Sequence, residues 1–408
     1  MKKIALLIAI FLIITSCKNL ESPSLKEGIW LGEIKLMDNQ TLPFNFKISK
    51  SAQGDYIMES FNAEEVLFID EITTNNDSIM IKMPAFEGYI YGVFSESEII
   101  GDFIQESMDR SVSFKATYGI EKRFDVKVSS ELNVSGVWES EFSPNTTDSY
   151  MGKGVFTQTG EDRVVGTFRT TTGDYRFLEG VMDGDSLKLS TFDGAHVFLF
   201  MAKVTDSTLN GTFYSGNHFK EPFVAKRNAT YELPDEDSLT FIKEGYEKLS
   251  FSFADSKGNM VSLEDELFKD KVVIVQIMGT WCPNCLDETK YLVNFLKEQR
   301  NEDLEIVALS FEYAKTEEAA FKAINRLKER IGIDYPVLLA QYGSSDKDLA
   351  QEKLPMLNHI LSYPTTIFLD KTGAVRKIST GFNGPATGEK YDQFDADFRV
   401  FIGGLLKE

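Results

Sequence analysis

Residues 280–285 read TWCPNC and separate two segments of different character in this chain of 408 residues. Before them, residues 272–278 are apolar and rich in β-branched side chains, which predicts a strand buried on both faces. After them, apolar residues recur at helical spacing over 286–300. Cys282 and Cys285 would stand at a helix start, where backbone N–H groups favour a thiolate and one turn separates the two sulfurs. The pattern predicts a redox-active dithiol.

The last part of the chain alternates predicted strands and helices. Strands are expected at 272–278, 304–311, 335–339, 365–370 and 374–378, and helices at 286–300, 317–331 and 394–406. This alternation predicts an α/β domain with a mixed central sheet.

Two further motifs accompany the dithiol. Residues 253–263 look like an added N-terminal hairpin, and residues 363–370 read YPTTIFLD. With TWCPNC, they make about residues 251–408 similar to the TlpA/ResA-like branch of the thioredoxin superfamily, the envelope-facing thiol–disulfide reductases. The resemblance implies a thioredoxin-like fold.

The resemblance also implies which residues meet a substrate. In this branch the proline at the position of Pro364 is cis and faces the cysteine pair. The backbone of the preceding residue, here Tyr363, pairs with the bound substrate chain. Trp281, Tyr363 and Pro364 are therefore the expected substrate-binding residues.

Catalytic roles follow from the spacing and from the resemblance. Cys282 is expected to attack a substrate disulfide and Cys285 to resolve the mixed disulfide, leaving a Cys282–Cys285 disulfide. Glu288 resembles the acidic residue that this branch keeps near the buried thiol, where a carboxylate with a raised pKa could accept its proton. Asp287 is expected to be a solvated helix residue. Gln276 replaces the buried acid or asparagine of relatives, so their proton relay is absent.

The N-terminus has the composition of an export signal. Two lysines precede the apolar run 4–14, which is too short to span a bilayer comfortably. Residues 14–17, ITSC, resemble a bacterial lipobox, so residues 1–16 are the expected signal peptide and Cys17 the lipidation site. Residues 17–25 would tether the chain to lipid, in the bacterial cell envelope and facing the periplasm. An ordinary secretory signal is the alternative.

The middle of the chain repeats at a shift of 108 residues, as shown by GIW at 28–30 and GVW at 136–138. Alternating apolar residues predict two tandem all-β barrels or sandwiches, 26–120 and 134–229, each of about eight strands. Residues 230–248 look like a linker to the α/β domain 249–408. The β domains could be a spacer, a partner-docking surface or a ligand cup.

Charge and composition exclude several classes of function. The net charge is −20 and no block is strongly basic, so nucleic acid is not an expected partner. Three cysteines and three scattered histidines lack the spacing of a metal site, so neither a metal nor another cofactor is expected. Half of a zinc site would lack its partner ligands, and a structural disulfide would explain neither the preceding strand nor the tryptophan.

The sequence therefore predicts a membrane-tethered extracytoplasmic thiol–disulfide oxidoreductase that reduces disulfide-containing client proteins. An upstream membrane electron donor would restore the dithiol, and acylated Cys17 would bind membrane lipid. One alternative is an AhpC-like thiol peroxidase on the same fold, although Val275 and Gly279 replace the proline and threonine of its motif. The other is a non-enzymatic binding lipoprotein with an accessory redox domain.

Overall fold

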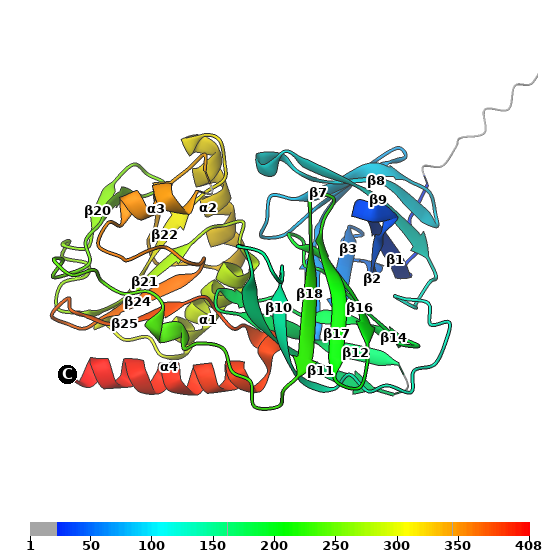
Figure 1. Cartoon of the computed structure of the whole chain (residues 1–408). Coiled ribbons are helices and arrows are strands. Elements are labelled where there is room, and N and C mark those ends of the chain that lie inside the picture. The colour runs from blue at the N-terminus through cyan, green and yellow to red at the C-terminus, as the bar shows by residue number, and fades with distance from the viewer. Residues whose placement is uncertain (1–22, 161, 345) are drawn as a thin grey trace, which may run out of the picture.

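The computed structural model describes residues 23–160, 162–344 and 346–408. Two all-β units lie beside one α/β unit (Figure 1). This arrangement confirms the predicted fold class of two β repeats followed by an α/β domain with a mixed sheet. The predicted signal peptide, residues 1–16, and Cys17 lie outside the described residues. Within the described ranges, no helix is long and apolar enough to cross a membrane.

β domain 1 is a nine-stranded antiparallel sheet, one strand more than expected, in the order β4-β3-β2-β1-β9-β8-β7-β6-β5. Its strands are β1 (Gly28–Lys35), β2 (Thr41–Lys50), β3 (Tyr56–Asn62), β4 (Glu65–Ile69), β5 (Glu71–Asn75), β6 (Ser78–Lys82), β7 (Tyr89–Phe94), β8 (Glu98–Gln105) and β9 (Arg110–Tyr118).

β domain 2 is a closed barrel, because β12 pairs both with β14 and with β11. The two-residue strand β13 adds a short hairpin to β12. The strands are β10 (Gly136–Phe142), β11 (Tyr150–Thr159), β12 (Arg163–Thr170), β13 (Gly173–Asp174), β14 (Leu178–Asp183), β15 (Ser186–Phe192), β16 (Val197–Val204), β17 (Thr208–Ser215) and β18 (Phe219–Arg227).

The two β domains share the topology that the repeat predicts. Strand β1 lies between β2 and β9, and β10 lies between β11 and β18 in the same way. Trp30 and Trp138 occupy equivalent positions and are fully buried. Each indole Nε1 donates to the carbonyl four residues earlier, Lys26 O at 3.0 Å and Val134 O at 2.8 Å. A core tryptophan thus anchors the start of each β domain.

The α/β domain contains a seven-stranded sheet in the order β20-β19-β23-β22-β21-β24-β25, with β21, β22 and β23 parallel to one another. The strands are β19 (Ser252–Ala254), β20 (Met260–Ser262), β21 (Val272–Met278), β22 (Leu304–Phe311), β23 (Val337–Gln341), β24 (Thr365–Leu369) and β25 (Val375–Thr380). The helices are α1 (Pro283–Glu298), α2 (Glu317–Ile331), α3 (Lys347–Lys353) and α4 (Glu389–Lys407).

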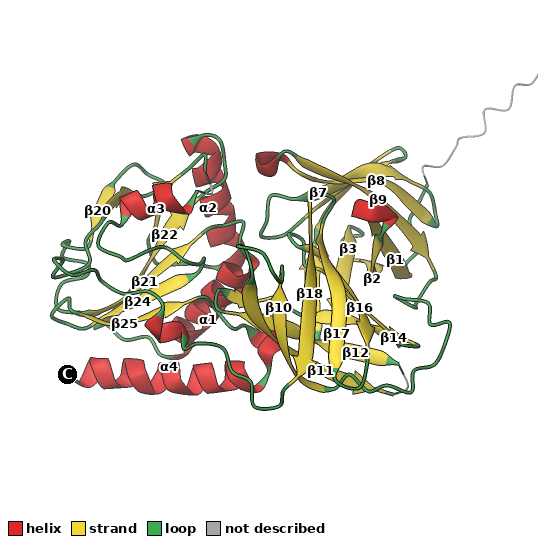
Figure 2. Ribbon diagram, viewed as in Figure 1, coloured by secondary structure: helices red, strands yellow, loops and turns green. Residues whose placement is uncertain are grey.

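The long helices of the molecule gather in this domain (Figure 2). Alternate residues of β21 enter two apolar cores, one on each face of the sheet. Val272 and Ile274 pack with residues of α1, α2 and α4, whereas Val273 and Val275 pack with α3. The central strand is therefore buried on both faces, as its apolar run predicts.

The helices of the α/β domain differ from the sequence expectations in two places. Helix α4 begins at Glu389 rather than at residue 394, because its first turn is too polar to show apolar spacing. Helix α3 was not predicted, since it has only seven residues and one buried side chain, Ala350.

The equivalent tryptophans lead to a first prediction. Trp138→Ala should lower the free energy of unfolding by about 3–5 kcal/mol, because it empties a fully buried site. Phe68→Ala, a control at a side chain that is 51% exposed, should change it by no more than about 0.5 kcal/mol. Urea denaturation followed by circular dichroism measures both. Equal losses in the two variants would contradict the assignment of Trp138 to the core.

Candidate functional site

The two thiols stand at the N-terminus of α1, as predicted. Pro283 occupies the first helical turn, where its missing N–H has no helical partner to lose, so the helix begins three residues earlier than expected. Cys282 is the N-cap, and its Sγ accepts a hydrogen bond from the backbone N–H of Cys285 at 3.2 Å. Both cysteines are free, with exposures of 6% for Cys282 and 0% for Cys285.

The loop before β24 lies against the first thiol. The Tyr363–Pro364 peptide bond is cis, as predicted. The Cys282 thiol donates to the carbonyl oxygen of Tyr363 at 3.3 Å. The Trp281 ring contacts the Tyr363 ring edge-on at 5.5 Å between centroids, and its Nε1 donates to Phe311 O at 2.8 Å. The predicted substrate-binding residues thus surround Cys282.

Glu288 is a buried carboxylate held by two donors. Its Oε2 accepts from Gln276 Nε2 at 2.8 Å, and its Oε1 accepts from Thr366 Oγ1 at 2.7 Å. Burial raises the pKa of Glu288 to about 7, although both hydrogen bonds oppose the shift. Gln276, the residue that departs from the pattern of the related branch, thereby positions this acid. A carboxyl that titrates near neutral pH can exchange protons under ordinary conditions.

Cys285 is less acidic than an ordinary thiol. Burial raises its pKa most, and hydrogen bonding with Cys282 and the charge of Glu288 add to the shift. The inner thiol therefore keeps its proton at neutral pH until a nearby base removes it.

Glu312 is a second buried carboxylate beside the site, and the sequence analysis missed it. It accepts hydrogen bonds from the Thr280 backbone N–H at 2.9 Å, the Thr280 hydroxyl at 2.6 Å and the Ser310 hydroxyl. Burial raises its pKa, and these bonds oppose the shift. Glu312 fixes the turn that precedes Trp281. Its position just after a predicted buried strand was the available signal.

Part of β domain 2 covers the site. The β12–β13 segment, residues 170–176, reaches the dithiol helix and the cis-proline loop. Ser362 Oγ donates to Thr172 O at 2.7 Å, and Asn284 Nδ2 donates to Asp174 O at 3.1 Å. Asn284, one of the two residues between the cysteines, and Ser362, the residue before Tyr363, are therefore both hydrogen-bonded to β domain 2.

The covering segment approaches closely because it contains a glycine. Gly173 has φ +133°, and a Cβ there would collide with Nδ2 of Asn284. Asp174 beside it accepts from the Gly384 N–H at 2.6 Å, through Oδ2. Burial raises the pKa of Asp174 to about 6, opposed by the Gly384 hydrogen bond and by Arg176. A side chain at position 173 would push the segment away from the dithiol helix.

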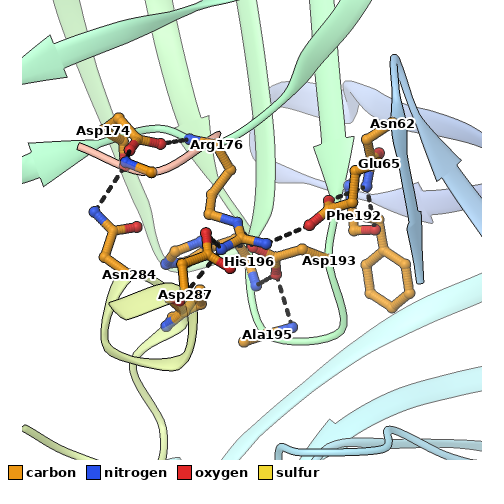
Figure 3. Close-up of polar contacts among 12 residues, drawn as sticks. Asn62, Glu65, Asp174, Arg176, Phe192, Asp193, Ala195, His196, Asn284 and Asp287 are labelled. Atoms are coloured by element: carbon orange, nitrogen blue, oxygen red, sulfur yellow. Dashed lines mark hydrogen bonds and ion pairs between the residues drawn. The ribbon is translucent and has the colours of Figure 1, made fainter. Parts of the chain in front are cut away.

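Arg176 joins all three domains (Figure 3). Its buried guanidinium pairs with Glu65 of β domain 1, with Asp193 of β domain 2 and with Asp287 of α1. It also donates to the carbonyl oxygen of Pro283 at 3.2 Å. Burial would lower the pKa of Arg176, but the three carboxylates outweigh burial and raise it. The cation therefore stays charged in the interior.

The expectation for Asp287 was wrong. Its side chain is only 12% exposed and pairs with Arg176 instead of facing solvent. Helical spacing indicates that Asp287 lies on another face of α1 from the buried residues. It does not indicate that a second domain covers that face.

The Arg176 cluster leads to a second prediction. Arg176→Met leaves three carboxylates without their shared cation, so it should lower the free energy of unfolding by about 3–5 kcal/mol. Arg163→Met is the matched control, because Arg163 is 50% exposed and pairs only at the surface with Glu179. Arg163→Met should lower the free energy of unfolding by no more than about 1 kcal/mol. Urea denaturation compares them, and similar losses would contradict a structural role for Arg176.

The comparisons with known proteins agree with this geometry. The Redoxin family model matches residues 243–394. Thiol-disulfide oxidoreductase ResA of Bacillus subtilis (strain 168) is 29% identical over 142 residues, which cover 34% of this chain and 69% of that protein. Thioredoxin-like protein YneN of the same strain is 28% identical over 140 residues, which cover 34% of this chain and 73% of that protein.

Among solved structures, a thiol-disulfide oxidoreductase from Bacteroides fragilis NCTC 9343 is 21% identical, with a TM-score of 0.27, over 36% of this chain and 99% of that chain. The thioredoxin domain of a thiol-disulfide oxidoreductase from Bacteroides vulgatus is 23% identical, with a TM-score of 0.27, over 38% of this chain and 99% of that chain. The family match, the relatives and the paired thiols lead to one conclusion. Residues 243–394 match the Redoxin family model and carry the paired thiols, so this part of the chain is a thiol–disulfide oxidoreductase domain similar to ResA.

Proposed function

We propose that this oxidoreductase reduces disulfides of client proteins outside the cytoplasm, held to a membrane by acylated Cys17. The observation that carries the proposal is the pair of free thiols at the start of α1, one of them bonded to the cis-proline loop. The predicted signal peptide and lipobox support export and lipid anchoring, with the chain in the bacterial envelope and facing the periplasm.

The reaction is a two-electron exchange. The Cys282 thiolate attacks one sulfur of the client disulfide, and the other client sulfur leaves as a thiolate that takes up a proton. Cys285, once deprotonated, attacks Cys282 in the mixed disulfide and releases the second client thiol. The client gains two thiols, and the chain ends with a Cys282–Cys285 disulfide. A membrane dithiol donor returns it to the reduced form.

The roles of the two cysteines rest on their surroundings. Cys282 is the more accessible thiol and has the Tyr363 carbonyl beside it, where a client backbone could pair. Cys285 has no exposed surface and a raised pKa, so its attack needs a base. Glu288, one helical turn away, influences the thiol electrostatically and is the proposed acceptor of its proton.

The proposed direction is reduction. Pro283 and Asn284 separate the cysteines, and neither carries the positive charge that would further stabilise a Cys282 thiolate. Strongly oxidising dithiols depend on such stabilisation of their reduced form. The reduction potential should lie below about −200 mV, measured by equilibration with a glutathione buffer. A value near about −120 mV, typical of a strong oxidant, would contradict reduction.

Cys285→Ser should trap the client. With insulin as a model client, this variant should remain joined to one insulin chain through Cys282, because the resolving thiol is missing. Non-reducing electrophoresis and mass spectrometry detect the adduct. Wild type should reduce insulin with turnover when a small dithiol is supplied.

The control for the trap is Cys282→Ser, which should neither form an adduct nor reduce insulin. An insulin adduct on Cys282→Ser would contradict the assignment of the attacking thiol. Rapid peroxide consumption by wild type, without insulin reduction, would favour a thiol peroxidase instead.

Glu288→Gln leads to a pH-dependent prediction. Because burial raises the pKa of Glu288 from 4.5 to about 7, folding disfavours its carboxylate form. Wild type should therefore lose stability as pH rises from 4.5 to about 7, and Glu288→Gln should lack this loss. Relative to wild type, the free energy of unfolding of the variant should rise across this window by on the order of 3 kcal/mol. Urea denaturation at each pH measures it.

Glu329→Gln, at an exposed position of α2, is the matched control and should follow the wild-type profile. The catalytic role has a separate readout. At neutral pH, resolution of a preformed mixed disulfide should be at least about tenfold slower in Glu288→Gln than in wild type. If Glu288→Gln and wild type showed parallel stability profiles and the same resolution rate, both the titration of Glu288 and its catalytic role would be contradicted.

A further inference from the structure

A cavity of about 580 Å³ lies where the three domains meet, beside the residue that precedes the attacking cysteine. β domain 1 contributes the end of β8 and the start of β9. β domain 2 contributes the start of β16 and the turn after β17. The α/β domain contributes Trp281 and Tyr313. The cavity therefore exists only because all three domains are present.

The cavity wall has a charge opposite to that of the chain as a whole. The chain has 63 acidic and 43 basic residues. Nevertheless, the described residues that line the cavity include two cations, Arg110 and Lys315, two histidines, His196 and His218, and no aspartate or glutamate. A wall of this composition in an acidic protein favours a ligand that carries negative charge.

Arg110 is the cation in this wall that has no anionic partner. Lys315 pairs with Asp109 at 2.8 Å, and the His196 ring pairs with Asp193 at 3.1 Å. In the part of the chain that the structure describes, the half-buried Arg110 guanidinium makes no ion pair or hydrogen bond. His218 beside it has a lowered pKa, through burial and the charge of Arg110, so it is a neutral hydrogen-bonding group at neutral pH.

The cavity wall reaches the residue next to the attacking cysteine. Trp281 in its wall is the neighbour of Cys282, and its ring contacts Tyr313 at 4.0 Å and Tyr363 at 5.5 Å between centroids. The Tyr363 carbonyl accepts from the Cys282 thiol. On the flank formed by Asn284 and Ser362, the covering segment 170–176 already occupies the surface. None of residues 170–176 lines the cavity at Trp281, which leaves that side for a client.

We infer that this cavity receives the client segment next to the reacting disulfide, and that Arg110 selects an aspartate or glutamate in that segment. The inference rests on the proposed reduction of client disulfides and adds a substrate class to it, acidic polypeptide segments. Arg110 is a specificity-determining residue here, because its charge would attract the acidic side chain without contacting the reacting sulfurs.

Two disulfide-linked peptides that differ only by glutamate or glutamine beside the cysteine test the inference. The prereduced full chain is mixed with each peptide, and single-turnover rates are followed by tryptophan fluorescence and by mass spectrometry. The glutamate peptide should react about two- to fivefold faster at low salt, and the difference should shrink in high salt. Arg110→Glu should abolish or reverse the preference.

Lys127→Glu is the matched control, because it makes the same charge change at an exposed residue outside the cavity wall. It should keep the preference for the glutamate peptide. Arg110→Gln, which avoids charge reversal, should remove the preference while the glutamine peptide reacts at the wild-type rate.

Equal rates for the two peptides with wild type would overturn the inference while leaving disulfide reduction intact. A preference retained in Arg110→Gln would overturn it as well. Failure of wild type to reduce either peptide would contradict the proposed function itself, and the inference with it.

Discussion

The buried guanidinium of Arg176 is the interaction on which the arrangement of the site depends. One side chain from β domain 2 neutralises carboxylates from all three domains and bonds the carbonyl of Pro283 between the two cysteines. A buried charge is tolerated only when it is paired, so the cation and its carboxylates must come together as the domains pack. The position of α1 relative to the β domains is set by this requirement.

The β domains also contact the α/β domain at the dithiol site. Segment 170–176 is hydrogen-bonded to Asn284 of the dithiol helix and to Ser362 of the cis-proline loop. Strand ends of both β domains line the cavity beside Trp281. The two β domains therefore border the approach to Cys282.

Much of the chemistry could be predicted from local sequence. The spacing of Cys282 and Cys285 after a buried strand identified the dithiol, and the YPTT motif identified the cis proline. Glu288 was located by its spacing from Cys285, but its partner Gln276 was interpreted only as a missing relay. Glu312 was missed, and Asp287 was placed in solvent. These errors share a cause, since each residue acquires its role from a partner distant in the sequence.

By itself, the sequence determined the fold class, the paired thiols and most elements of the α/β domain, because hydrophobic periodicity and a helix-start motif act over a few residues. The tertiary structure alone decided the burial of Asp287, the covering of the dithiol and the cavity at the three-domain junction. These features depend on contacts between residues more than 100 positions apart, such as Arg176 with Glu65 and Asp287. Local patterns carry no information about such pairs, because packing of complete domains brings them together.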